Sequence, residues 1–163
     1  MGDRGVPVSI RAATMDDYAG LCALMAEVHR LHLDQLPYLF RETEGPVCGR
    51  DYLQRLIDDE QVGLFVAELD GALVGFVNVA LREAPDIPII VPRCYAHISD
   101  VVVRHDHWRA GIGRALMDRA HRWARDQGAT AVELNVYEFN DGARAFYQVL
   151  GYETVSRRMG RRL

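Results

Sequence analysis

The chain has 163 residues, with 19 Lys and Arg against 23 Asp and Glu and a formal net charge of −4. We expect one domain over residues 1–163, because this length suits a single proper core. The acidic balance argues against nucleic acid as the main partner, and three widely spaced cysteines argue against a disulfide framework or a metal site. An apolar leader and any run of about 18 apolar residues are both missing, so a cytoplasmic protein without a membrane partner is expected.

Hydrophobic periodicity alternates between strand and helix periods along the chain. Thr14 and Asp17 form a capping box before the first helix, and Asp70-Gly71 predicts a tight hairpin. The order of elements predicts an α/β fold with one mixed sheet, antiparallel in its N-terminal part and parallel around a crossover helix. The predicted elements are a strand over 8–13, a helix from 14 to about 29–33, a helix over 50–60, strands over 62–69, 72–81 and 95–103, a helix opening within 109–114 and ending at 127, a strand over 131–136, a helix over 141–150 and a last strand from 152 to 155.

The segment 101–116, VVVRHDHWRAGIGRAL, has the features of an anion site. A strand ends, a short loop follows and a helix begins, so backbone N–H groups at the positive end of the helix dipole converge. Gly111 and Gly113 let the backbone come close to a ligand. The spacing matches neither a P-loop nor a dinucleotide fingerprint, so phosphate binding and an ordinary strand-to-helix turn both remain open. Three arginines offer further phosphate contacts: Arg104, Arg109 and Arg114.

A second segment, 140–152, completes a pair of motifs that closely resembles the GNAT superfamily of N-acetyltransferases. In that family a V-x7-G-x-G/A pattern is followed by N-x-x-A-x-x-x-Y-x-x-x-G-[FY]. This chain departs from the family at Trp108, where Gln or Arg is common. The matching residues are Val103, Gly111 and Gly113 in the first pattern, and Asn140, Ala143, Tyr147, Gly151 and Tyr152 in the second.

The resemblance implies a GNAT-like sheet whose parallel strands splay at the cofactor site, with helices on both sides. It implies a transferase that uses acetyl-CoA, or another acyl-CoA, and transfers the acetyl group directly to a primary amine of a small molecule or a protein. A homodimer is a further implication. The backbone over 109–114 would hold the pyrophosphate, and the strand end at 101–103 would pair with the pantetheine arm. The implied cofactor-binding residues are Val101, Val102, Val103, Arg109, Ala110, Gly111, Ile112, Gly113, Arg114, Asn140, Ala143 and Tyr147.

Two residues are the predicted catalytic pair. A lysine-like amine has a pKa near 10.4, so a base must take up its proton, and the departing thiolate needs an acid. The resemblance places the Tyr147 hydroxyl near the thioester sulfur, and His97, six residues before Val103, is the candidate base. His97 as a structural histidine with cross-strand hydrogen bonds stays open. Alternation places Asp100 on the opposite face from His97, which leaves Asp100 and Glu133 as lesser candidates.

The acceptor amine is not encoded in these motifs. Substrate choice is expected in two variable segments, 29–46 and 82–94, whose acidic residues either attract a cationic amine or are simply solvated. Tyr38 and Phe40 either line a pocket or cover the core, and His29 and His32 are expected at the surface near a helix end. The C-terminal arginines are expected on a solvated strand edge or tail. The alternative function is a regulatory GNAT module that binds CoA without catalysis. The acidic residues of the two variable segments are Glu42, Glu44, Glu83 and Asp86.

Overall fold

The computed structural model describes residues 8–163, so the expected lack of an apolar leader falls in part on residues 1–7, outside this range. Its strands are β1 (Ser9–Ala12), β2 (Val62–Leu69), β3 (Ala72–Glu83), β4 (Cys94–Val103) and β5 (Val132–Leu134). Its helices are α1 (Tyr18–Gln35), α2 (Arg50–Asp58), α3 (Ile112–Asp126) and α4 (Asp141–Val149), with short 3₁₀ turns at Met15–Asp17 and His105–His107.

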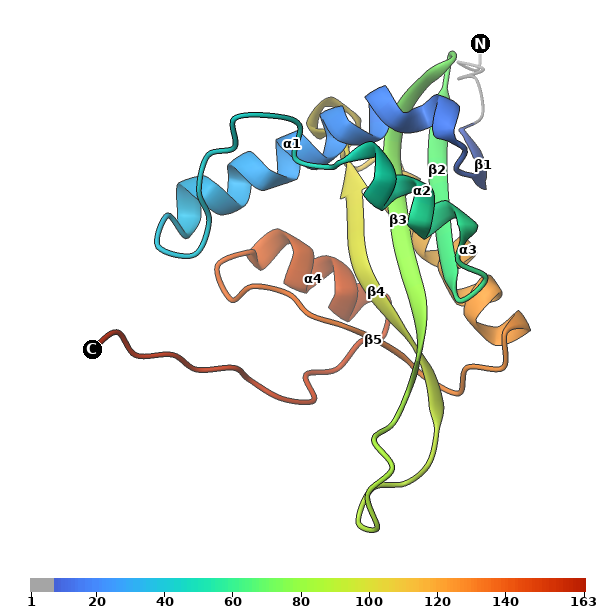
Figure 1. The fold of residues 1–163 in the computed structure, drawn as a ribbon, viewed down its shortest axis with the longest axis vertical. Coiled ribbons are helices and arrows are strands. Elements are labelled where there is room, and N and C mark those ends of the chain that lie inside the picture. The colour runs from blue at the N-terminus through green and yellow to red at the C-terminus, as the bar shows by residue number, and fades with distance from the viewer. Residues whose placement is uncertain (1–7) are drawn as a thin grey trace.

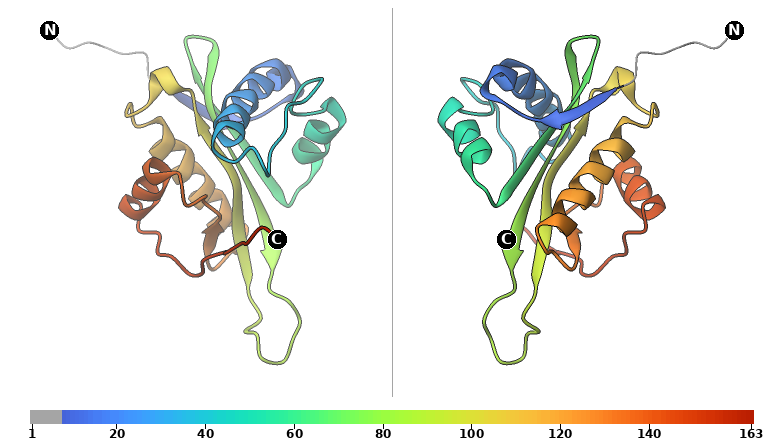
Figure 2. Two further views of the ribbon diagram at one scale, coloured as in Figure 1. Left: turned by 90° about the vertical axis from the view of Figure 1, so that its left-hand side faces the viewer. Right: turned by 90° about the vertical axis from the view of Figure 1, so that its right-hand side faces the viewer.

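One five-stranded sheet in the order β1-β2-β3-β4-β5 forms the centre of the molecule (Figure 1). Neighbours from β1 to β4 pair antiparallel and β4 pairs parallel with β5, which confirms the predicted mixed sheet. Helices α1 and α2 cover one face, and α3 and α4 cover the other (Figure 2). Pairing with β5 ends at Ile98, whereas β4 continues to Val103. The two strands therefore part, and one edge of β4 is left open over 99–103.

The core consists of two clusters of buried side chains, one on each face of the sheet. On the α3 face, Leu116 and Met117 pack against strand residues such as Val77. On the α1 face, Leu21 and Phe76 are among the fully buried side chains. Each such side chain stabilises the fold by about 1.5–3 kcal/mol relative to an exposed one.

The predicted turns and caps that depend on a few neighbouring residues are confirmed. The Asp17 carboxylate accepts a 2.8 Å hydrogen bond from the Thr14 N–H, which is half of the capping box. Asp70 and Gly71 both have positive φ, 52° and 77°, as a type I′ hairpin turn requires. Gly128, with φ of 83°, follows the end of α3 as expected.

Several boundaries differ from the prediction by a few residues, and the end of the first helix and the last strand are the clearest cases. The first helix extends to Gln35, because Pro37 rather than the apolar period stops it. Helix α3 begins at Ile112, within the predicted range of 109–114, because Arg109 and Gly111 have left-handed backbones with φ of 63° and 81°. The last strand, expected from 152 to 155, is wrong: the described chain has no strand after α4.

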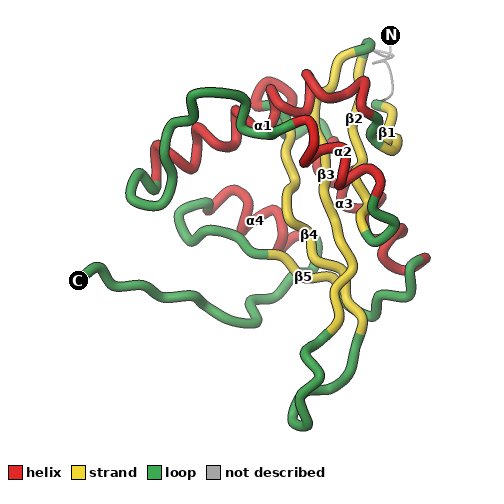
Figure 3. Tube along the Cα trace, viewed as in Figure 1, coloured by secondary structure: helices red, strands yellow, loops and turns green. Residues whose placement is uncertain are grey.

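The segment after α4 is an extended tail that Tyr152 anchors at its start, through a 2.7 Å hydrogen bond between its hydroxyl and the His121 ring, and that arginine side chains contact further on. Arg157 lies 3.4 Å from a Glu138 carboxylate oxygen, and the Arg162 guanidinium lies 4.8 Å from the centre of the Tyr38 ring. The tail runs past α4 toward the loop that follows α1 (Figures 1 and 3). Over residues 8–163, no helix is both long and apolar enough to cross a membrane.

Candidate active site

The loop after β4 forms a cradle of backbone N–H groups over 109–114, which we call the anion cradle. The first hydrogen bond within α3 runs from the Ala115 N–H to the Gly111 carbonyl, so the N–H groups before it have no acceptor within the helix. A Cβ on Gly111 would meet no atom within 4 Å, so the space beside the cradle is open. With a 15-residue helix behind it, this geometry favours an anion.

The three arginines of this segment have different partners. The Arg104 Nε donates to Asp106 at 2.7 Å, and the His107 ring bonds the same carboxylate at 2.6 Å. These partners lower the pKa of Asp106 to about 2. Arg104 thus holds the loop, whereas Arg109 and Arg114 form no ion pair with any described residue. The two exposed arginines are the ones available to an anion.

Trp108, where the chain departs from the family pattern, is bonded to the end of β4. Its Nε1 donates to the Val103 carbonyl at 2.7 Å. The Arg104 N–H bonds to Val74 on β3, so alternation directs the backbone groups of Val101 and Val103 to the open edge of β4. Trp108 already donates to the Val103 carbonyl. Val101 is therefore the residue whose backbone C=O and N–H can both bond an added strand.

Helix α4 packs beside the start of α3. The Asn140 side chain accepts from the Ala143 N–H at 3.1 Å, which confirms Asn140 as its N-cap. A Cβ on Gly113 would meet the Phe146 ring at 3.2 Å. Gly113 therefore allows α3 to contact α4, and only Gly111 is beside open space.

Tyr147 lies on α4 next to the parted strands. Its ring is half-buried, with the Phe146 ring at 5.4 Å and the Tyr152 ring at 5.8 Å between centroids. Burial, with a smaller contribution from Asp100, raises the pKa of Tyr147 to about 12. The phenol therefore keeps its proton throughout the neutral range.

A β-bulge changes which residues of β4 share a face. Asn78 pairs with Asp100 and Val79 pairs with Ile98, so Ser99 is an extra residue without a partner on β3. Ile98 is in the core of the α3 face, whereas Val102 is in the core of the α1 face. Asp100 therefore lies on the α1 face together with His97. The prediction that these two residues face opposite ways is wrong, because alternation does not continue through a bulge.

Asp100 is a half-buried carboxylate with polar neighbours on several elements. Burial raises its pKa, and the Asn78 amide with the His32 and His97 imidazoles acts against that shift. Its charge in turn raises the pKa of Tyr147, the candidate acid. The one signal for this environment in the sequence is Asn78, a lone polar residue in the apolar run from 73 to 81.

The other candidate bases have different surroundings. His97 is half-buried and stands opposite Ala80 on β3 and Glu133 on β5. Glu133 forms a 2.5 Å ion pair with Arg93, so its carboxylate is already matched by a protein cation. No ion pair of Asp100 occurs among residues 8–163.

The variable segment after α1 contributes aromatic side chains. His32 is half-buried, contrary to its predicted surface position, because the Phe40 ring stacks on it at 5.1 Å. Tyr137 and Phe139, from the loop between β5 and α4, contact the same imidazole at 5.1 and 6.0 Å. We call His32, Phe40, Tyr137 and Phe139 the aromatic cluster. Tyr38 is not part of it and is 58% exposed.

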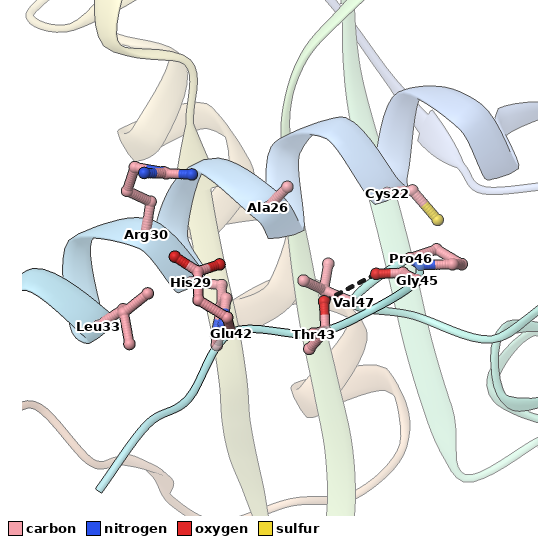
Figure 4. A pocket seen from close by; sticks show the side chains of 10 residues that line it. All are labelled: Cys22, Ala26, His29, Arg30, Leu33, Glu42, Thr43, Gly45, Pro46 and Val47. Atoms are coloured by element: carbon pink, nitrogen blue, oxygen red, sulfur yellow. Dashed lines mark hydrogen bonds between the residues drawn. The ribbon is translucent and has the colours of Figure 1, made fainter. Parts of the chain in front are cut away.

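A cavity of about 190 Å³ lies between α1 and the loop over 42–47 (Figure 4). Cys22, His29 and Glu42 are among its lining residues, and no residue of β4 or β5 is. This cavity is therefore separate from the parted strands. Glu42 lines this cavity and is not near Asp100. Asp86 is exposed in the projecting loop between β3 and β4 (Figure 3).

The acetyltransferase (GNAT) family model matches residues 25–152. The chain belongs to this GNAT family. The match spans both motifs and the anion cradle, so the resemblance predicted from the two motifs is confirmed. The uncharacterised N-acetyltransferase MJ1207 of Methanocaldococcus jannaschii is 33% identical over 145 residues. That alignment covers 89% of this chain and 60% of the relative, so this GNAT chain spans somewhat less than two thirds of that protein.

Solved structures agree with the GNAT fold. The BH1408 protein from Bacillus halodurans, solved as a tetramutant, has a TM-score of 0.90 and 28% identity, covering 95% of this chain and 99% of that chain. The aminoglycoside N-acetyltransferase AAC(6')-Iy, solved in complex with CoA, has a TM-score of 0.76 and 16% identity, covering 100% and 99%. At that identity the second structure supports the fold alone.

Proposed function

We propose that this GNAT protein is an acetyl-CoA-dependent N-acetyltransferase that transfers the acetyl group directly to a primary amine. One observation carries the proposal: the Asp100 carboxylate on β4 is close enough to Tyr147 to affect its phenol, and the anion cradle follows the end of the same strand, where β4 and β5 part. A phosphate-binding element, an acid that keeps its proton and a carboxylate without a protein cation are the parts that such a transfer needs.

The residues present fit the pyrophosphate and pantetheine of an acyl-CoA. The cradle over 109–114 offers unpaired N–H groups beside open space, and Arg109 and Arg114 add exposed positive charge. The open edge of β4 at Val101 offers a C=O and an N–H to the amide groups of an extended arm. When bound, acetyl-CoA supplies an activated thioester with a thiolate leaving group.

The proton balance defines the roles of the side chains. The amine nitrogen forms a bond to the acetyl carbon, the carbon–sulfur bond breaks, and one proton leaves the nitrogen while the sulfur takes one up. The Tyr147 Oη is the proposed donor to the sulfur. Its raised pKa of about 12 keeps the donor loaded at neutral pH.

Asp100 is the proposed first proton acceptor, with His97 beside it on the same face. The raised pKa of Asp100 brings this carboxylate closer to the operating pH, where a base works best. His97 stays a candidate for the same role, either alone or by passing the proton on. The two are separated by comparing His97→Ala with Asp100→Asn.

The experiment is a continuous free-thiol assay with acetyl-CoA and a panel of amines, with calorimetric titration of CoA in parallel. The proposal predicts CoA binding and thiol release that requires one class of amine, with the acetylated amine identified by mass spectrometry. CoA binding without release across the panel would favour a regulatory module. Lack of CoA binding would contradict the assignment of the cradle.

A further inference from the structure

The feature with the clearest unmet requirement is the Asp100 carboxylate. It is half-buried, and no Lys, Arg or His among residues 8–163 forms an ion pair with it. A carboxylate held partly away from water is normally paired, because removing its charge from water without a counterion is costly. The buried Asn78 Oδ1, which lies on the strand opposite, also has no hydrogen-bond partner in the described chain. The Asn78 amide is the neighbour that hydrogen-bonds Asp100. A carboxylate without a protein cation and an amide oxygen without a donor therefore remain for a donor from a ligand.

The aromatic cluster stands next to this carboxylate through His32. The His32 ring stacks on Phe40, with 16° between the planes, and meets Tyr137 edge-on. Tyr137 and Phe139 stack on each other at 5.9 Å with 18° between their planes. These rings come from α1, the loop after it and the loop before α4 (Figure 1). Three segments of the chain thus form the aromatic cluster beside Asp100.

The aromatic cluster is partly exposed and so accessible to a ligand. Tyr137 is 42% exposed, and Phe40 and Phe139 are half-buried. Aromatic faces attract a cation and pack well against flat apolar groups. The aromatic cluster therefore suits the apolar part of a molecule whose ammonium lies at Asp100.

The charges around Asp100 argue against a polycation. His32, Tyr52 and Tyr147 all lie close enough to Asp100 to be affected by its charge, and no second carboxylate affects any of them. Glu42 lines the separate cavity beyond α1. A spermidine-like or aminoglycoside acceptor is matched best by several unpaired carboxylates, and here the neighbouring Glu133 is already paired with Arg93, which leaves Asp100.

We propose that the acceptor is a primary amine with a single positive charge close to an aromatic or broad apolar group, held by Asp100 and the aromatic cluster. This inference rests on the proposed function of the same site. The shared chemistry has two sources, a free arylalkylamine or the α-amine of a peptide that begins with an aromatic residue. Asp100 receives the ammonium and takes its proton, and the rings contact the group next to it.

The test compares kcat/KM for four amines with acetyl-CoA: phenethylamine, n-butylamine, a Phe-Gly-Gly peptide and spermidine. We expect phenethylamine or the peptide to exceed butylamine and spermidine by at least roughly tenfold, because ring contacts add to apolar burial. A higher value for phenethylamine identifies the free amine as the source, and a higher value for the peptide identifies the α-amine.

Variants show whether the aromatic cluster makes the difference. Phe40→Leu and Tyr137→Leu should raise KM for the aromatic amine roughly three- to tenfold while kcat and the values for butylamine change little. Tyr38→Leu is the matched control, since that ring lies in the same loop but contacts Arg162. It should leave all four amines unchanged.

The failures are distinguishable. Spermidine or butylamine as the best acceptor, or equal loss for all amines in Phe40→Leu and Tyr137→Leu with CoA binding retained, overturns this inference and leaves acetyl transfer intact. No CoA binding and no transfer to any amine overturns the proposed function, and this inference with it.

Discussion

The two sides of β4 are built in different ways for the ligands that we propose. Toward α3, the site is made of backbone: unpaired N–H groups over 109–114 and the open edge at Val101. Toward α1, it is made of side chains, with Asp100 beside the aromatic cluster. Backbone sites restrict the residue types at a few fixed spacings, and so leave a motif. Side-chain sites assembled from distant segments leave none, and this is why cofactor and acceptor differ in what the sequence reveals.

The largest expected effect comes from a substitution on the α1 side of β4, where we propose that the acceptor amine binds. Asp100→Asn keeps the size of the side chain and removes the proton acceptor, so kcat should fall by roughly 10²–10⁴-fold. Steady-state thiol release measures this. Asp86→Asn, in the exposed loop between β3 and β4, is the matched control and should keep the wild-type rate. Full activity in Asp100→Asn with loss in His97→Ala would instead make His97 the base.

The pH dependence sharpens the same assignment. A base must be deprotonated, so kcat/KM should decrease as pH falls through the raised pKa of Asp100, at a pH above the ordinary 3.8. The groups facing Asp100 are Asn78, His97, His32, Tyr52 and Tyr147. The Asp100→Asn variant should lose this acid limb. If the limb persists unchanged, another group is titrating.

The next effect concerns the acid between the two sides. Tyr147→Phe removes the proton donor to the sulfur, and kcat should fall by up to roughly 10²-fold. Since the pKa of Tyr147 is about 12, the wild-type enzyme should show no alkaline loss from this group below about pH 11. A pH–rate profile of both proteins checks this, and an unchanged kcat in the variant would refute the role.

A smaller effect should appear on the cofactor side alone. Gly111 has φ of 81°, where a side chain costs about 1–2 kcal/mol, so Gly111→Ala should shift the loop and weaken CoA binding about tenfold. Gly45→Ala, at a position with open space and ordinary φ, should have no effect. Calorimetry with CoA measures both. Equal CoA affinity in Gly111→Ala would contradict the anion cradle.

The smallest effect on activity comes from a residue outside both sides. The Asp17 carboxylate bonds Arg11 twice at 2.8 Å, and Arg11 in turn bonds Glu68. Asp17→Asn should lower the free energy of unfolding by roughly 1–3 kcal/mol in urea titrations while kcat is kept. Because Arg11 lowers the pKa of Asp17, this stabilisation is present above pH 3.8 and is lost as pH falls through the lowered value. Constant stability across that range would contradict this.

The elements that depend on local chemistry could be predicted from the sequence. The strand over 62–69, the Asp70-Gly71 turn and the Asn140 cap each follow from a few neighbouring residues. The family motif is local in the same sense, since Gly111 is needed for a positive φ and Gly113 for contact with Phe146.

The rest depends on pairing between distant segments. The bulge at Ser99 arises from the register of β4 against β3, so the face of Asp100 could not be found by alternation alone. The aromatic cluster joins His32 to residues about a hundred positions later, and Trp108 bonds a carbonyl that only the strand edge presents. The tail after α4 looked like a strand by composition, but β5 has only three residues with which to pair it.

The most direct test of the division between the two sides is an equilibrium titration of CoA into wild-type protein and Asp100→Asn under identical conditions. We predict equal affinity and stoichiometry for both proteins, because the cofactor is held by backbone on the other side of β4. Loss of CoA binding in Asp100→Asn, or no binding by the wild type, would contradict the account.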